Sequence, residues 1–265
     1  MVNVKTNVKT SAQMAFSSIV GLTAFLLLVF VPAGTFHYWR GWAFIAVFAA
    51  ATLLPSVYLL INNPDALRRR MQAGPQAESR PLQKAIIAFA FLSMAAMIVV
   101  SVLDFRFGWS TVPAVVSVAG LVLVAAGLTI AMLVAVQNGY AAANVTVESG
   151  QQVSSTGWYG LVRHPMYFGN VILMIGTPPA LGSYWGLLFV SVGLSVLALR
   201  ITDEESLLTR ELAGYREYTQ TVHYRLMPYV WWSFAFCHTR RNTATTANRA
   251  TVLATIVVLT RVTAM

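Results

Sequence analysis

Residues 157–170 of the chain read GWYGLVRHPMYFGN and set Arg163 and His164 directly before Pro165, at the mouth of an apolar stretch. Proline is favoured at the first position of a helix, where its missing N–H has no intrahelical partner. We therefore predict a helix that begins at Pro165, whose free first-turn N–H groups could hold an anionic group such as a carboxylate. The other interpretation is a topological arginine with an interfacial histidine and tyrosine, which are common at membrane borders. These residues alone favour neither interpretation.

The composition is that of an integral membrane protein. Of the 265 residues, 57% are hydrophobic and 10% are charged, whereas a soluble domain has about 25% charged residues. The length fits one compact bundle. The net charge of +9 does not indicate a nucleic-acid partner, because the basic residues cluster beside the apolar runs, where Lys and Arg set topology. The single cysteine, Cys237, excludes an internal disulfide and a cysteine-based metal site, and we predict no metal.

Four apolar runs are each long enough to cross a hydrocarbon core of about 30 Å as a helix. They lie at residues 15–32, 42–61, 85–103 and 112–136. A fifth region, residues 168–199, is too long for one simple span and contains Pro178 and Pro179, which disfavour a continuous helix. We predict a shorter broken or re-entrant leg over residues 167–175, a turn, and a fifth membrane helix over residues 184–200. The predicted fold is an all-α, polytopic membrane bundle of about five transmembrane helices.

The basic residues are distributed unevenly between the two ends of these runs. If the N-terminus is cytoplasmic, all of the 18 Lys and Arg residues except Arg40 and Arg106 lie on the cytoplasmic side. An excess of Lys and Arg is characteristic of cytoplasmic loops. We therefore predict a multi-pass protein with its N-terminus inside, and with both the motif at residues 157–170 and the acidic stretch described next on the cytoplasmic face.

The chain divides by composition into three parts. Residues 1–137 form N-terminal transmembrane helices, residues 138–232 form a core that contains the helical hairpin, and residues 233–265 form a C-terminal tail. The tail is rich in Thr, Ala and Arg, and its one apolar run is too short to span a membrane. We expect the tail to be poorly ordered or to lie on the membrane surface.

Residues 200–218 are charged with helical spacing, and five of the nine acidic residues fall between Asp203 and Glu217. Arg200 and Glu204 are four residues apart and can pair on one helix face. One interpretation is a solvated helix end with ordinary surface pairs. In the functional interpretation, a carboxylate accepts hydrogen bonds from ribose hydroxyls or an amino group, and Arg200 holds an anionic substrate. Because a hairpin returns its ends to one side, this cluster and the motif at residues 157–170 can close one pocket between water and lipid.

Between residues 144 and 232 the chain resembles the catalytic core of the isoprenylcysteine carboxyl methyltransferase family, a group that includes phospholipid methyltransferases. The order and spacing of five motifs carry the resemblance: Thr156-Gly157-Trp158-Tyr159, Arg163-His164-Pro165-Met166-Tyr167-Phe168-Gly169, Gly176-Thr177-Pro178, Asp203-Glu204-Glu205 and Gly214-Tyr215-Arg216-Glu217-Tyr218. The resemblance implies a membrane enzyme that binds S-adenosyl-L-methionine in a cytoplasmic C-terminal pocket. It also implies methyl transfer to a lipid-like or hydrophobic substrate, with a carboxylate as the expected acceptor.

The resemblance further implies roles for individual residues. The cofactor contacts it implies are Asn144, Gln151, Tyr159, His164, Pro165, Met166, Tyr167 and Glu205. Gln151 stands where the eukaryotic enzymes carry a histidine. The catalytic residues that it implies are His164, Arg200 and Glu204, with Arg200 binding the substrate.

Several functions remain open at this point. A carboxylate acceptor is already ionised at neutral pH, whereas a phospholipid amine must lose a proton, which His164 or Glu204 could accept. A second alternative is an NADPH-dependent membrane reductase resembling the steroid 5α-reductase group. A third is a non-enzymatic channel, carrier or assembly protein, but the four clear spans hold no Asp, Glu, Lys, Arg or His between their ends, which argues against transport. The sequence identifies neither the substrate nor the oligomeric state.

Overall fold

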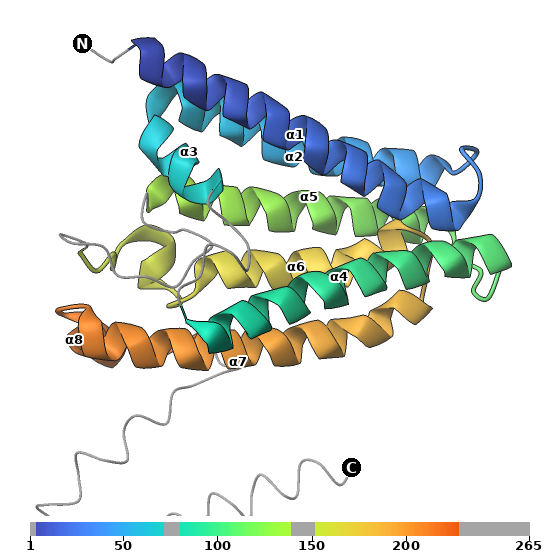
Figure 1. Ribbon diagram of the computed structural model, residues 1–265. Coiled ribbons are helices and arrows are strands. Elements are labelled where there is room, and N and C mark those ends of the chain that lie inside the picture. The colour runs from blue at the N-terminus through green and yellow to red at the C-terminus, as the bar shows by residue number, and fades with distance from the viewer. Residues whose placement is uncertain (1–3, 72–79, 139–151, 228–265) are drawn as a thin grey trace, which may run out of the picture.

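The computed structural model describes residues 4–71, 80–138 and 152–227, and these residues form helices without a β-strand. The long helices run side by side, with α1 and α2 along one face of the bundle and α7 along the other (Figure 1). The helices are α1 (Val4–Ala33), α2 (Trp39–Asn62), α3 (Pro64–Met71), α4 (Pro81–Phe107), α5 (Ala114–Gln137), α6 (Pro165–Ala180), α7 (Leu188–Glu211) and α8 (Tyr215–Thr221), with 3₁₀ turns η2 (Gly157–Gly160) and η3 (Trp185–Leu187). The predicted all-α membrane bundle is confirmed.

Five segments of the described chain are long and apolar enough to cross a membrane: Ser11–Ala33, Trp39–Asn62, Pro81–Phe107, Ala114–Gln137 and Trp185–Glu211. The predicted runs fall on these spans, and the fifth span continues past the predicted end at Arg200. The first two spans are 11% and 17% buried, against 39–44% for the other three. Helices α1 and α2 therefore lie at the periphery and present most of their apolar side chains outward, as lipid allows.

Helices α5 and α6 pack backbone to backbone along four glycines, which we call the glycine seam. A Cβ atom on Gly120 would lie 2.4 Å from the Ala180 backbone nitrogen, and one on Gly127 would lie 2.5 Å from the Gly169 carbonyl oxygen. Cβ atoms on Gly169 and Gly176 would meet the carbonyl oxygens of Gly127 and Gly120 at 2.6 and 2.8 Å. Small residues allow membrane helices to approach this closely. The seam fixes α6, and therefore the motif at its start, against α5.

The predicted hairpin is present, but its first leg is longer than we expected. Helix α6 continues through Pro178 and Pro179, whereas the sequence suggested a turn after Ile175. Proline keeps a helical φ but has no N–H to donate to the carbonyl four residues earlier, so Pro178 and Pro179 cost α6 two backbone hydrogen bonds, and the helix ends just after them at Ala180. Gly176 belongs to the glycine seam rather than to a turn. The chain reverses at Gly182, whose φ of +78° is the left-handed conformation that glycine adopts readily.

Two short helices were not predicted separately. Helix α3 carries Pro64 and Asp65 in its first turn and three arginines in its last turn, which suit the two ends of a helix dipole. Helix α8 is separated from α7 by Gly214, whose φ is +80°. The charged segment at residues 200–218 is therefore two helices with a sharp bend between them.

Buried polar groups close the end of the bundle at η3, which we call the hairpin end. Asp104 of α4 is fully buried and accepts hydrogen bonds from the Ser110 backbone N–H at 2.7 Å and from the Ser183 hydroxyl at 2.6 Å, and also from the Ser110 hydroxyl. The Tyr38 hydroxyl donates to the Leu181 carbonyl oxygen at 2.5 Å. These contacts tie the end of α4 and the start of α2 to the α6–α7 turn.

The opposite end, where α6 begins and α7 finishes, is the motif end. The predicted loop at residues 138–162 is described at residue 138 and from residue 152 onward, and it contains η2. The tail at residues 233–265 lies outside the described residues, and the three-part division of the chain stays a prediction.

Candidate active site

Helix α6 begins at Pro165 as predicted, with His164 immediately before it. The backbone N–H groups of Arg163 and His164 donate to the carbonyl oxygens of Tyr224 and Arg225, each at 2.9 Å. The segment after α8 therefore lies along the entrance of α6. The Arg163 and His164 residues are only 4% and 5% exposed, so they face protein. This burial argues against a topological arginine, which would point its guanidinium to water.

Glu205 of α7 lies at the centre of this entrance. Its Oε1 is 3.1 Å from Arg163 Nε and 3.3 Å from His164 Nε2, and its Oε2 accepts a hydrogen bond from Arg225 Nε at 2.8 Å. Glu205 is 7% exposed. These four residues form the Glu205 cluster, in which the α6 entrance, α7 and the segment after α8 share one buried carboxylate.

A second set of contacts, the Arg200 network, continues toward α4. The Tyr167 hydroxyl donates to Glu204 Oε2 at 2.6 Å and accepts from Arg200 Nε at 2.9 Å. Arg200 Nη1 donates to Gln83 Oε1 at 2.6 Å, and the Gln83 amide donates to Asp203. Tyr167 and Gln83 therefore orient the Arg200 guanidinium from two helices.

The two clusters adjoin at His164. Its ring stacks on that of Tyr167, with centroids 5.5 Å apart and planes 16° from parallel. His164 Nδ1 lies 4.0 Å from Glu204 Oε1, while Nε2 faces Glu205. One imidazole thus stands between two carboxylates and connects both networks, a position from which a proton can be passed.

Donors without acceptors remain beside Glu205. Burial lowers the pKa of the Arg163 guanidinium, an effect that Glu205 opposes. Burial also raises the pKa of Tyr215 and Tyr218 in α8, so both phenols are hydrogen-bond donors at neutral pH. Tyr218 donates to the Tyr159 carbonyl oxygen at 2.7 Å. Among the described residues, Arg163 Nη2 and the Tyr215 hydroxyl have no acceptor, and an unmet buried donor costs about 1–3 kcal/mol.

The structure brings most of the predicted site residues together. Five belong to the Glu205 cluster or the Arg200 network: His164, Tyr167, Arg200, Glu204 and Glu205. Pro165 and Met166 form the first turn of α6. Tyr159 lies in η2, next to Tyr218. Asn144 and Gln151 lie outside the described residues, so their contacts stay predictions.

Sequence reasoning missed Gln83 and Arg225. Gln83 lies in the first turn of α4 and is fully buried. A lone amide at the start of an apolar helix was the available signal, because a buried amide needs partners. Arg225 follows α8 in a basic, aromatic stretch, where it resembles a topological charge. Only the backbone pairing described above brings it to Glu205.

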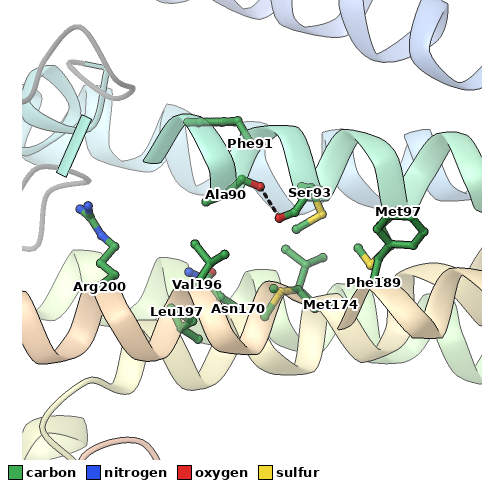
Figure 2. Close-up of a pocket in the computed structure, with 13 residues that line it drawn as sticks. Ala90, Phe91, Ser93, Met97, Asn170, Met174, Phe189, Val196, Leu197 and Arg200 are labelled. Atoms are coloured by element: carbon green, nitrogen blue, oxygen red, sulfur yellow. Dashed lines mark hydrogen bonds between the residues drawn. The ribbon is translucent and has the colours of Figure 1, made fainter. Parts of the chain in front are cut away.

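Two adjoining cavities open beside the Arg200 network. The first, of about 260 Å³, lies between α4, α6 and α7 and is lined mostly by apolar side chains. Figure 2 shows Arg200 at one end of this cavity and Met97 and Phe189 at the other. The second, of about 360 Å³, extends toward α2, α3 and α5 and shares five lining residues with the first: Ala90, Phe91, Asn170, Leu197 and Arg200. An apolar cavity that ends at a cation suits a ligand with a hydrocarbon chain and an anionic head.

Residues 115–210 match the model of the isoprenylcysteine carboxyl methyltransferase (ICMT) family. The resemblance predicted from the motifs is thereby confirmed over this segment, which covers α5, α6 and α7 almost to its end. The ICMT-family segment includes His164, Arg200, Glu204 and Glu205 and stops before Arg225.

The chain also matches part of a reductase. It is 31% identical to Delta(14)-sterol reductase TM7SF2 of Mus musculus over 90 residues, which are 33% of this chain and 22% of that protein. The chain therefore matches about a fifth of the length of this relative. No solved structure matches the chain.

Proposed function

We propose that this protein is an integral-membrane methyltransferase that uses S-adenosyl-L-methionine to methylate a carboxylate on a lipid-like substrate. One observation carries the proposal. The ICMT-family segment holds His164, Glu205 and Arg200 in adjoining buried networks, and these networks border an apolar cavity. A soluble cofactor and a membrane-borne substrate can react only where a polar site adjoins an apolar one.

The residues around Glu205 fit the proposed cofactor, which carries a carboxylate, an amine, ribose hydroxyls and a sulfonium. Arg163 Nη2 and the Tyr215 hydroxyl are buried donors without an acceptor among the described residues, and the cofactor carboxylate would supply one. The rings of Tyr159 and Tyr167 are candidates for contact with the sulfonium, worth about 0.5–2 kcal/mol. Glu205 contributes by holding Arg163 in position. When bound, the cofactor supplies an electrophilic methyl group.

The substrate side of the proposal rests on Arg200. Its guanidinium would bind the acceptor carboxylate, and Tyr167 and Gln83 keep it in one orientation. A carboxylate needs no base, so the protein has only to align it and exclude water. Alignment of this kind can supply about 7–11 kcal/mol of the barrier reduction. The first cavity would hold the apolar chain of the substrate.

Phospholipid N-methylation is the alternative within the same class. His164, between Glu204 and Glu205, could accept the proton that an amine must lose. A cationic amine beside Arg200 would be repelled, however, which is why we favour the carboxylate.

A membrane reductase is the second candidate function, favoured by the match to the mouse sterol reductase. That match covers a small part of the relative, so it supports the reductase less than the ICMT-family segment supports the methyltransferase. The two functions differ in their cofactors, which makes them separable by binding.

We also propose that the motif end is cytoplasmic. The Glu205 cluster and the Arg200 network both lie at this end, where α6 begins and α7 finishes. The excess of Lys and Arg in the loops on this side supports the orientation. Accessibility of a cysteine introduced at exposed Glu211 to an impermeant reagent in inside-out vesicles would test it.

Calorimetry on the detergent-purified full chain tests the cofactor. We expect micromolar binding of S-adenosyl-L-methionine and no binding of NADPH. Glu205→Gln keeps the side-chain size but removes the charge that attracts Arg163 and Arg225. The affinity for S-adenosyl-L-methionine should therefore fall about tenfold or more. Glu211→Gln, an exposed position at the end of the same helix, is the matched control and should bind as wild type. Binding of NADPH alone would support the reductase, and binding of neither would reject both enzymes.

A further inference from the structure

Arg70 of α3 lines the second cavity together with Arg200, and the function proposed above gives it no role. It is half-buried, and within residues 4–71, 80–138 and 152–227 it has no hydrogen-bond or ion-pair partner. Burial lowers the pKa of its guanidinium. The neighbouring Arg68, by contrast, pairs with Asp65 at 3.2 Å. Arg70 is therefore a cation turned toward a cavity rather than toward a carboxylate of the described chain.

The cavity that Arg70 lines is mostly apolar, and apart from Arg200 its polar lining residues are the uncharged Thr52, Tyr167 and Asn170. Leu128, Ala131 and Met132 of α5 line the same cavity. Two guanidinium groups that face one weakly solvated space repel each other, and the repulsion is larger there than in water. An anion between them would remove this cost and would accept charge-assisted hydrogen bonds from both.

The two cavities together have the form of one amphiphile site. They share Ala90, Phe91 and Leu197, so a mostly apolar surface joins the two cavities. In the first cavity it leads from Arg200 to Met97 and Phe189 (Figure 2). One end is cationic and the other is lined by hydrocarbon and thioether groups. A ligand with a charged head and one long chain matches both ends.

We propose that Arg70 and Arg200 jointly bind the anionic head of a single-chain, lipid-like ligand whose chain occupies the first cavity. Arg70 is then a specificity-determining residue that favours anionic heads by binding them more tightly than neutral or cationic ones. The identification of this ligand with the methyl acceptor rests on the proposed function, but the binding site does not require methyl transfer. A carboxylate and a phosphate share the necessary chemistry.

Binding of three probes with the same chain tests the proposal: oleate, oleyl phosphate and oleyl alcohol. Each is titrated into the full-length protein by calorimetry in one non-ionic detergent. Arg70→Gln should weaken binding of at least one anionic probe about tenfold or more, since a hydrogen bond to a charged group contributes about 1.5–3 kcal/mol. Oleyl alcohol should be unaffected. The tighter of the two anionic probes identifies carboxylate or phosphate as the preferred head.

Arg69→Gln is the matched control, because it removes the same charge from the same helix but from a residue that does not line the cavity. It should leave all three probes unchanged, and Arg70→Lys should retain part of the anion binding. Equal binding of oleate and oleyl phosphate to wild type and Arg70→Gln would overturn the proposal. So would an equal loss for oleyl alcohol, which would mean that Arg70 only packs against the chain.

Binding of S-adenosyl-L-methionine, measured on the same samples, separates this proposal from the previous one. Arg70→Gln should bind the cofactor as wild type does. If wild type binds no cofactor while oleate binding still depends on Arg70, the proposed methyl transfer fails and the anion site stands.

Discussion

Asp104 at the hairpin end and Glu205 at the motif end are both buried carboxylates, but different groups surround them. Asp104 accepts hydrogen bonds from serine hydroxyls and backbone N–H groups. Glu205 lies among two arginines and a histidine. The first arrangement balances one charge with neutral donors that belong to a turn. The second gathers more cations than the carboxylate can neutralise.

We interpret this difference as one between a structural cluster at the hairpin end and the proposed binding cluster at the motif end. At the hairpin end, the closest donors to the Asp104 carboxylate belong to Ser110 and Ser183, which lie in the α4–α5 and α6–α7 connections. A structural role in holding these connections together accounts for the contacts. At the motif end, the donors on Arg163 and Tyr215 are still unmet after the contacts among the described residues are counted. An anionic ligand would complete the second cluster and has no place in the first.

The largest expected effect comes from deleting the two carboxylates in turn. Glu205→Ala leaves buried cations unpaired and should lower the free energy of unfolding by about 3–5 kcal/mol. Asp104→Ala leaves neutral donors unmet and should cost about 1–3 kcal/mol. Thermal unfolding in detergent, followed by circular dichroism, compares the two variants, and cofactor binding should be lost only with Glu205. A larger cost for Asp104→Ala would mean that the comparison of the two ends is wrong.

The glycine seam allows each end to be disturbed separately. Gly127 meets α6 at Gly169, near the motif end, and Gly120 meets it at Gly176 and Ala180, near the hairpin end. Alanine at either position forces the backbones apart and should cost about 1–3 kcal/mol of unfolding free energy. Only Gly127→Ala should also weaken binding of S-adenosyl-L-methionine, because it shifts the start of α6.

Gly21→Ala is the control for these two variants. A Cβ atom at Gly21 meets nothing within 4 Å, so alanine there should be neutral or should stabilise α1 by about 0.5–1 kcal/mol. Equal losses of cofactor binding in Gly120→Ala and Gly127→Ala would show that the seam acts on the bundle as a whole rather than on each end.

The smallest effect should follow from removing one hydroxyl. Tyr167→Phe deletes the contact that joins Glu204 to Arg200, and turnover should fall about tenfold, equivalent to about 1.4 kcal/mol. Cofactor affinity should change little, because phenylalanine keeps the aromatic ring at this position. Tyr184→Phe, an exposed tyrosine at the hairpin end, should have wild-type turnover. Methyl transfer to an isoprenylcysteine probe measures both, and loss of cofactor affinity in Tyr167→Phe would assign the hydroxyl to the cofactor instead.

Much of the fold could be predicted because membrane spans are local features. The apolar runs mark α2, α4, α5 and the end of α1 within a few residues, although α1 begins at Val4, well before its run. The hairpin follows from the length of the next apolar region. The end of α6 could not be placed correctly, since Gly176 and Pro178 resemble a turn in the sequence. Gly176 is used for contact with α5, which only the packed bundle reveals. The equal spacing of Gly120 and Gly127 on one helix and Gly169 and Gly176 on the other was a signal we did not use.

The candidate site was predictable where its residues lie on the hairpin. His164 and Glu205 are brought together by the return of α7 to the start of α6, as the sequence suggested. Gln83 and Arg225 come from elements outside the hairpin, and no periodicity relates them to it. Their contacts depend on how α4 and the segment after α8 pack, which is a tertiary property.

The backbone pairing of Arg163 and His164 with Tyr224 and Arg225 has a consequence for biosynthesis. The ribosome makes the α6 entrance some sixty residues before the strand-like partner that satisfies its N–H groups. All five spans can therefore be inserted while the Glu205 cluster is still incomplete. The segment after α8 emerges after all five spans and completes the cluster, so a chain truncated before Arg225 and released from the ribosome would reach the membrane with its spans intact and the cluster unformed.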